Sequence, residues 1–442
     1  MTPNKVIAGN RTKSLQDTDR MLELPCVANQ TPYLPRVVDS LLSASLEKPV
    51  AVVIEGAKGV GKTETATHHA ASRVLLDVDQ EAKAAAAVDP SLVLAGDKPR
   101  LLDEWQEVPQ LWNNVRRAVD AREGPFILTG SAVPADDASR HTGAGRFSWI
   151  RMRPMTLFEL GRSSGSVSLR GLLDGETTNV NAGELGIGEL AELICIGGWP
   201  ALVGSGVDAA SHFLGGYLDS IARADIQRVD GVGRDPDRVR RVLRSLARNV
   251  STEVAITTIA SDAGGSDGPV DPDTVSSYLR ALERLMVLED QPAWAPRLRS
   301  RARLRSASKR HLCDPSLAAA LLNATPERLL KDFNFLGFLF ESLVVRDLRV
   351  YAQSNGATVS HYRDNVGEVD IIIDGGEHWA AVEVKLGISY VDEAATSLRR
   401  FLERIDTAHR GEPAFLAVVL PTPYGYVRED GVHVIPIHAL GP

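Results

Sequence analysis

The chain has 442 residues, of which 44% are hydrophobic and 24% charged, the balance of a globular protein with roughly two to four domains. Its three cysteines are far apart and lack CxxC spacing, which argues against a disulfide framework or a zinc site and favours a reducing cytoplasm. The net charge of −8 gives no global argument for nucleic-acid binding, so any such contact requires a local basic patch.

The first part of the chain alternates between short apolar runs and helical patterns. After a polar, irregular segment at 1–30 and helical spacing at 34–47, we expect strands at 50–56, 73–79, 99–104 and 125–131 and helices at 62–72 and 109–122. This alternation is typical of a parallel sheet joined by crossover helices. The sequence therefore predicts an α/β domain over residues 31–160.

A looser, mainly helical region is predicted over residues 161–315, after a polar loop at 136–148. Two amphipathic stretches flank the glycine-rich loop 264–269, and Asp271 is a suitable N-cap for the second stretch. This order fits a helix-turn-helix or winged-helix unit.

The last segment, residues 316–442, begins a new pattern. It contains a helical stretch at 333–350, several strand-like runs, a helix at 392–405 and two final apolar strands. We predict a separate α/β domain here.

Residues 56–63 read GAKGVGKT, which fits the P-loop pattern G-x-x-x-x-G-K-[ST] between a predicted strand and a predicted helix. The loop N–H groups and the helix N-terminus favour bound phosphate, Lys62 reaches the β- and γ-phosphates, and the Thr63 hydroxyl ligates Mg²⁺. The predicted ATP contacts are Gly56, Ala57, Lys58, Gly59, Val60, Gly61, Lys62, Thr63 and Glu64.

Hydrolysis needs further groups, and the segment LLDE at 101–104 supplies two of them. Asp103, at the end of an apolar strand, is suited to hold Mg²⁺, and Glu104 is placed to polarise the attacking water. Ser131, or alternatively Thr129, is a candidate contact to the γ-phosphate. Arg146, with Arg140 as the alternative, is a candidate charge-neutralising arginine, acting on its own chain or on a neighbouring subunit.

Several segments together resemble a prokaryotic AAA+-type, archaeal-ATPase-like family. They are DEWQEVPQLWNNVRRAVD after the acidic strand end, FILTGS, GRFSWIRMRPMTLFEL and the later GGWP at 197–200. The resemblance extends from Tyr33 to the last strand. It implies a P-loop ATPase with a winged helix and a C-terminal nuclease-like domain of undefined function. The chain has Ala57-Lys58 where family members often have Pro-Arg, at positions that act mainly through their backbone.

The C-terminal segment carries Asp370 on one predicted strand and Glu383-x-Lys385 on the next. Residues i and i+2 of a strand share a face, so a hairpin can bring these side chains together. Two carboxylates can bind Mg²⁺ or Mn²⁺, and a neighbouring lysine can position a water. The pattern resembles the PD-(D/E)XK, or restriction-endonuclease-like, core, with Glu341 on the preceding helix as its extra acid. Both an active nuclease and a binding or docking domain remain open.

Arginines occupy every second position of PRLRSRARLRS, so on a strand they would project from one face and could follow a phosphate backbone. They are Arg297, Arg299, Arg301, Arg303 and Arg305. The alternative is a solvated strand or one paired with acidic residues.

These patterns predict a cytoplasmic ATP hydrolase that acts on, or is controlled by, DNA or RNA, with metal-dependent cleavage as an additional activity. The alternative is an ATP-dependent switch whose C-terminal domain only docks, as a homo-oligomer or with a protein partner. No run approaches the ~18 apolar residues of a membrane span, and the polar N-terminus does not fit a signal peptide.

Overall fold

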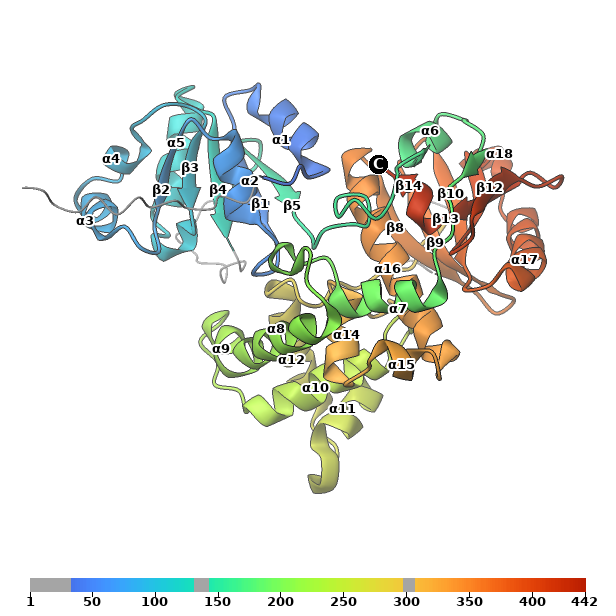
Figure 1. The fold of residues 1–442 in the computed structure, drawn as a ribbon. Helices are drawn as coiled ribbons and strands as arrows, with labels where there is room; N and C mark the ends of the chain where they lie inside the picture. Colours follow the sequence, from blue (N-terminus) through green and yellow to red (C-terminus); the bar gives the residue numbers. More distant parts are fainter. Residues whose placement is uncertain (1–32, 131–142, 297–306) are drawn as a thin grey trace, which may run out of the picture. The chain divides into compact units, whose positions relative to one another are not determined.

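The computed structural model describes residues 33–130, 143–296 and 307–442. Its N-terminal part builds a five-stranded parallel sheet in the order β2-β3-β4-β1-β5 (Figure 1). The strands are β1 (Ala51–Glu55), β2 (Ser72–Leu75), β3 (Arg100–Asp103), β4 (Phe126–Gly130) and β5 (Phe147–Arg151). The predicted parallel α/β sheet is confirmed.

Helices cover both faces of this sheet, because β1 has apolar side chains on both of its faces. Val52 and Ile54 pack toward α1 (Val38–Leu46) and α2 (Lys62–His69). Ala51 and Val53 pack in a second core that includes the apolar side chains of α5 (Leu111–Asp120). The short helices α3 (Gln80–Val88) and α4 (Ser91–Leu94) contribute to this second core.

Strand β5 lies partly where the sequence predicted a loop at 136–148. It pairs in parallel with β1, yet of its five residues only Ile150 is fully buried. An edge strand that buries one side chain lacks the continuous apolar run that identified the central strands, which explains why the pattern missed it.

The middle of the chain is helical, as predicted. Its helices are α7 (Ile187–Ile196), α8 (Val207–Ser220), a π-helical turn (Ile221–Asp225), α9 (Ile226–Arg228), α10 (Pro236–Arg248), α11 (Ile256–Gly264), α12 (Pro272–Arg284), α14 (Pro315–Leu321) and α15 (Pro326–Leu329). The side chain of Asp271 accepts hydrogen bonds from the N–H groups of Asp273 and Thr274, so the predicted N-cap is confirmed.

Two extended segments follow α12, residues 287–294 and 308–313, which we call the two arms. They pair antiparallel through Leu288 with Leu312 and Gln291 with Lys309, and Arg310 also bridges to Thr252. Residues 297–306, which carry the predicted arginine row, connect the arms and lie outside the described residues.

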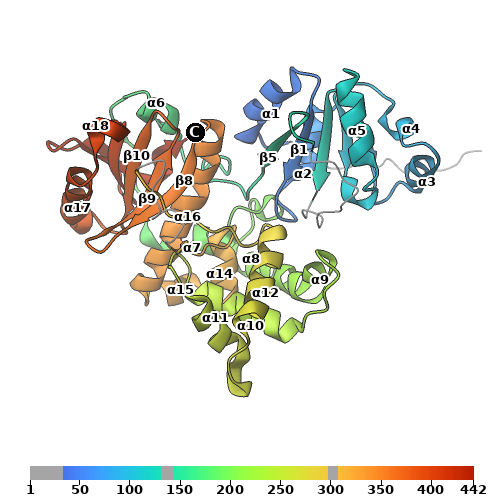
Figure 2. The same cartoon turned by 180° about the vertical axis from the view of Figure 1, so that it is seen from behind.

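The C-terminal part is a seven-stranded sheet in the order β7-β12-β13-β11-β10-β9-β8. Figure 2 shows the part of this sheet that holds β8, β9 and β10. Its strands are β7 (Val180–Asn181), β8 (Thr358–Arg363), β9 (Glu368–Asp374), β10 (Trp379–Val384), β11 (Phe415–Leu420), β12 (Tyr424–Val427) and β13 (Val432–Pro436). Apolar side chains of α16 (Phe333–Ser354) pack on one face and those of α17 (Val391–Glu403) on the other. The short helix α18 (Thr407–Arg410) precedes β11.

The packing at the edges of this sheet differs from the predicted boundaries at 161–315 and 316–442. Strand β7 joins the C-terminal sheet, and β6 (Val167–Ser168), followed by α6 (Leu169–Leu173), pairs with β14 (Leu440–Gly441). Helix α14 instead packs on α7, α8 and α10. A strand of two residues is too short to show a hydrophobic period, so the sequence could not predict β6, β7 or β14 or their pairing with distant strands.

Candidate functional site

The predicted P-loop joins the end of β1 to the start of α2. Gly59 and Gly61 have φ angles of 77° and 96°, a region that favours glycine. A Cβ atom on Gly56 would lie 2.2 Å from the carbonyl oxygen of Met152, so a side chain has no room there. The glycines thus allow the tight loop that opens onto the N-terminus of α2, where N–H groups favour an anion.

Lys62 is buried inside this loop, with its Nζ atom donating to the carbonyl oxygens of Gly56 and Ala57, each at 2.9 Å. Burial lowers the pKa of Lys62 to about 8, although Glu104 and Asp103 oppose this shift. A buried ammonium beside the N-terminus of a helix is a donor set that fits a polyphosphate.

The predicted magnesium ligands also meet. Thr63 Oγ1 donates to Asp103 Oδ1 at 2.9 Å, and Asp103 is buried at the carboxyl end of β3. Thr129 Oγ1 donates to the same carboxylate oxygen. Burial raises the pKa of Asp103, while the hydrogen bonds from Thr129 and Thr63 oppose the shift. A hydroxyl and a carboxylate oxygen in contact are the oxygen ligands that Mg²⁺ prefers, so these residues fit the ion.

Glu104 follows directly, at a φ of 50°, a backbone conformation that non-glycine residues rarely adopt. Its N–H donates to Thr129 Oγ1 at 3.2 Å, and its carboxylate accepts from Gln106 Nε2. The Thr129 hydroxyl therefore connects the backbone of Glu104 to the carboxylate of Asp103, and this connection orients the strand end.

The remaining candidates of the P-loop domain are placed differently. Ser131 and Arg140 lie outside the described residues. Arg146 is at the amino end of β1, where its carbonyl accepts from Ala51 N–H, and its side chain pairs with Asp120 at 2.8 Å. The P-loop begins at the other end of β1, about 13 Å along the strand. The structure does not bring Arg146 to the P-loop of its own chain.

At the C-terminal site, the predicted meeting of Asp370, Glu383 and Lys385 is confirmed. Strands β9 and β10 are antiparallel, with Val382 opposite Ile371, which places the two acids side by side. Lys385 Nζ lies 2.6 Å from Glu383 Oε2 and 3.5 Å from Asp370 Oδ2. Val384 N–H donates to Asp370 Oδ2 at 2.9 Å.

Glu341 on α16 completes what we call the carboxylate cluster (Glu341, Asp370, Glu383), but it contacts a lysine that the sequence analysis did not consider for this site. Lys309 Nζ lies 2.8 Å from Glu341 Oε1 and 3.5 Å from Asp370 Oδ1. Lys309 belongs to the second arm and is only 4% exposed. In the sequence, Lys309 follows the predicted arginine row at 297–305, and no local pattern indicates its contact with Glu341.

The three carboxylates of this cluster face two ammonium groups, and their pKa values shift in different directions. Burial, with Asp370 nearby, raises the pKa of Glu341 to about 8. Burial would also raise the pKa of Asp370, but Lys309 and Lys385 hold it below its usual value. In the part of the chain that the structure describes, no group of three or more His, Cys, Asp or Glu side chains is arranged to hold a metal ion. With ammonium groups on its oxygens, the cluster does not fit a divalent metal in this arrangement.

Comparison with known protein families assigns the N-terminal sheet. Residues 48–161 match an AAA domain. Residues 187–328 and 336–440 match two domains of unknown function, DUF8612 and DUF4143. None of the curated proteins matches the chain. The P-loop, Asp103 and Glu104 all lie within the AAA domain, which indicates ATPase-like nucleotide binding.

The AAA domain also makes contacts with residues outside it that the sequence analysis missed. Arg36 NH1 donates to the Val60 carbonyl at 2.8 Å, and its Nε pairs with Glu159 at 3.0 Å. Lys58 Nζ lies 2.6 Å from Asp225, in the π-helical turn of the helical region. These partners are 24 to 167 residues apart in the chain, so no local pattern predicts them.

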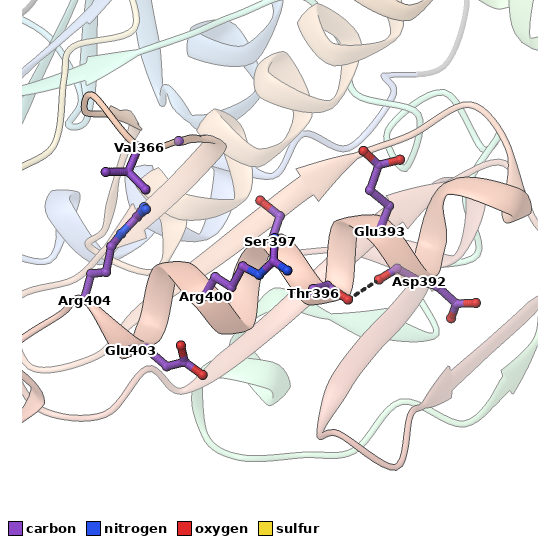
Figure 3. A pocket seen from close by; sticks show the side chains of 9 residues that line it. Val366, Asp392, Glu393, Thr396, Ser397, Arg400, Glu403 and Arg404 are labelled. Atoms are coloured by element: carbon purple, nitrogen blue, oxygen red, sulfur yellow. Dashed lines mark hydrogen bonds between the residues drawn. The ribbon is translucent and has the colours of Figure 1, made fainter.

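Two hollows lie in the C-terminal part. One, of about 740 Å³, is lined by Glu341, Asp370 and Lys385 together with apolar residues that include Phe338 and Leu386. The other, shown in Figure 3, runs along α17 beside side chains of mixed charge such as Asp392, Glu393 and Arg400. The first opens onto the carboxylate cluster, and the second is a solvated helix face. Over the described ranges, every helix is too short or too polar to cross a membrane.

Proposed function

We propose that the chain is a Mg²⁺-dependent ATPase. The observation that carries this proposal is the arrangement of Lys62, Thr63 and Asp103, a buried ammonium next to a hydroxyl–carboxylate pair, inside a matched AAA domain. Mg²⁺, when bound, would neutralise phosphate charge and orient the nucleotide.

Within this proposal, each residue has a separate task. Lys62 and the N–H groups of residues 56–64 bind the phosphates, and Thr63 with Asp103 holds the metal ion. Glu104 accepts a proton from the attacking water, because its carboxylate follows the Mg²⁺ ligand directly. Ser131 contacts the γ-phosphate. Arg146, which lies at the opposite end of β1, acts on the nucleotide of a neighbouring subunit.

We also propose that nucleic acid controls this activity. The order of α10, α11 and α12 followed by two antiparallel arms supports a winged helix, and five arginines lie between the arms in the sequence. The contact between Lys58 and Asp225 joins the P-loop to the helical region, so nucleotide binding has a direct route to it.

For the C-terminal domain, two candidate functions compete. Asp370, Glu383, Lys385 and Glu341 support a nuclease-like core with Mg²⁺ or Mn²⁺. The contacts of Lys309 and Lys385 with the carboxylates favour the alternative, in which this domain docks or binds without cleavage. We propose the second function as the better supported one.

The ATPase proposal is tested by phosphate release from ATP and Mg²⁺ with the purified chain and its Glu104→Gln variant. We expect nucleotide binding to be retained and hydrolysis to slow on the order of 100-fold or more, since the amide cannot accept the proton. Glu107→Gln is the matched control, because Glu107 lies in the short 3-10 helix (Trp105–Glu107) that follows Glu104, and it pairs with Lys83. Unchanged turnover in Glu104→Gln would refute the base assignment.

The nucleic-acid proposal is tested by adding a panel of DNA and RNA to the same assay. A changed rate of phosphate release supports it, and no effect with any nucleic acid contradicts it. In parallel, cleavage with Mg²⁺ or Mn²⁺ is measured for the parent, Asp370→Ala and Glu383→Ala. Cleavage that both substitutions abolish would overturn the docking function.

A further inference from the structure

We infer that Lys309 is a built-in cation of the carboxylate cluster, which fastens the second arm to the C-terminal domain and excludes a divalent metal ion while it stays in place. This inference does not depend on the ATPase proposal. It concerns a contact between parts of the chain that are distant in sequence.

The position of Lys309 provides the first argument. Its ammonium lies between Glu341 on α16 and Asp370 on β9, at 2.8 and 3.5 Å from their oxygens. All three side chains are buried, with at most 10% of any of them exposed. Buried charges require an opposite charge or a hydrogen-bonding partner, and here Lys309 supplies both to two acids at once.

Competition for oxygen atoms provides the second argument. Lys309 contacts Glu341 Oε1 and Asp370 Oδ1, while Lys385 contacts Glu383 Oε2 and Asp370 Oδ2. A divalent cation would have to bind some of these atoms with two ammonium groups beside it. Like charges at such distances repel strongly in a buried site, so the ion can enter only if Lys309 leaves.

The arms themselves provide the third argument, because they are held to the C-terminal sheet by other buried contacts. Gln291 pairs with Lys309 through both backbone groups, and its side-chain Nε2 donates to the carbonyls of Ser360 and Asp370, each at 3.0 Å. Trp294 Nε1 donates to Asp374 Oδ2 at 2.7 Å. The backbone of Lys309 is therefore held in place by its strand partner.

A second set of contacts holds the second arm at His311. The His311 ring lies between Gln291 Oε1 at 3.1 Å and Ser342 Oγ at 3.2 Å, and is fully buried. The first arm follows α12 and the second arm leads into α14, so both arms connect the carboxylate cluster to the helical region. Withdrawal of the second arm would remove the Lys309 ammonium from Glu341 and Asp370 together.

The test is a search for a metal site at the carboxylate cluster in nucleotide-free protein. Lys309→Met keeps most of the apolar length of the side chain and removes its charge. We measure Mn²⁺ binding, and we locate the site by local backbone cleavage with bound Fe²⁺ and peroxide. In Lys309→Met we expect at least about tenfold tighter Mn²⁺ binding, with cleavage around residues 368–386, because the buried acids then lack their cation.

The parent protein and Lys331→Met, which changes an exposed lysine, should show no cleavage around residues 368–386. Cleavage there in the parent as strong as in Lys309→Met would overturn the inference. So would a folded Lys309→Met protein with no gain in Mn²⁺ binding.

A measurement on the parent protein does not depend on the folding of the variant. Mild labelling with an amine-reactive ester should leave Lys309 unmodified while Lys331 reacts. Equal labelling of the two lysines would show that the Lys309 ammonium is free, and the inference would fail.

Discussion

The P-loop and the carboxylate cluster both bring lysines close to acidic side chains, but these lysines contact different atoms. At the P-loop, Lys62 donates to the carbonyls of Gly56 and Ala57, and Asp103 accepts from hydroxyl groups. At the carboxylate cluster, Lys309 and Lys385 lie directly on carboxylate oxygens. The difference shows that the same residue types, lysine beside acidic residues, can form two sites with different chemistry. An ammonium held by neutral groups can still receive an anion, whereas one held by carboxylates is already neutralised.

The largest expected effect separates the two lysine environments. Lys62→Ala should weaken ATP binding on the order of 100-fold. The variant lacks the two charge-assisted hydrogen bonds that we expect from the Lys62 ammonium to the phosphates of ATP. Each contributes about 1.5 kcal/mol, and ~1.4 kcal/mol corresponds to a factor of ten in affinity. Calorimetric titration with ATP and Mg²⁺ measures the change. Lys385→Ala is the counterpart at the other end and should leave ATP affinity unchanged. An equal loss of ATP affinity in Lys62→Ala and Lys385→Ala would show that the two lysines do not differ in this way.

A smaller effect is expected from Thr129→Val, which keeps the shape of the side chain but removes its hydroxyl. The backbone N–H of Glu104 and the Asp103 carboxylate then each lose a hydrogen bond. We expect turnover to slow about tenfold with nearly unchanged ATP affinity, because an unpaired buried polar group costs roughly 1–3 kcal/mol. Steady-state phosphate release at saturating ATP measures this. A full-rate variant would show that Thr129 does not orient the strand end.

The smallest effect is expected from Lys58→Ala in the P-loop itself. Lys58 is 45% exposed, and its pair with Asp225 is therefore largely screened. We expect ATP affinity to change less than about threefold, because exposed ion pairs contribute ~0.2–1 kcal/mol. The same titration measures it beside Lys62→Ala. A loss as large as that of Lys62→Ala would mean that Lys58 contacts the nucleotide.

Much of the AAA domain could be predicted from the sequence because its signals are local. The P-loop needs eight consecutive residues, the buried strands are continuous apolar runs, and Asp103 and Glu104 end such a run. The hairpin of β9 and β10 was predictable for the same reason, since its two strands are neighbours in the chain. Strand β5 was not, because it buries too little to show a pattern.

The features that the sequence did not predict depend on contacts between distant segments of the chain. Lys309 meets Glu341 and Asp370 only after the arms pair and α16 packs on the sheet, so its role has no local signature. The predicted role of Arg146 depends on local sequence, which does not reveal the end of β1 at which the residue lies. Local patterns identify chemical groups, whereas tertiary packing decides which of them meet.

The pairing of β7 with β12 has a consequence for how the chain is made. Thr178 hydrogen-bonds His433, at 2.9 Å and 255 residues further along. During synthesis, the segment around β7 leaves the ribosome long before its partner strand exists, and the AAA domain can fold in that interval. The C-terminal sheet closes last, when the final residues emerge. A chain that loses its last twenty residues would leave the early segment without its partner, although its P-loop would be intact.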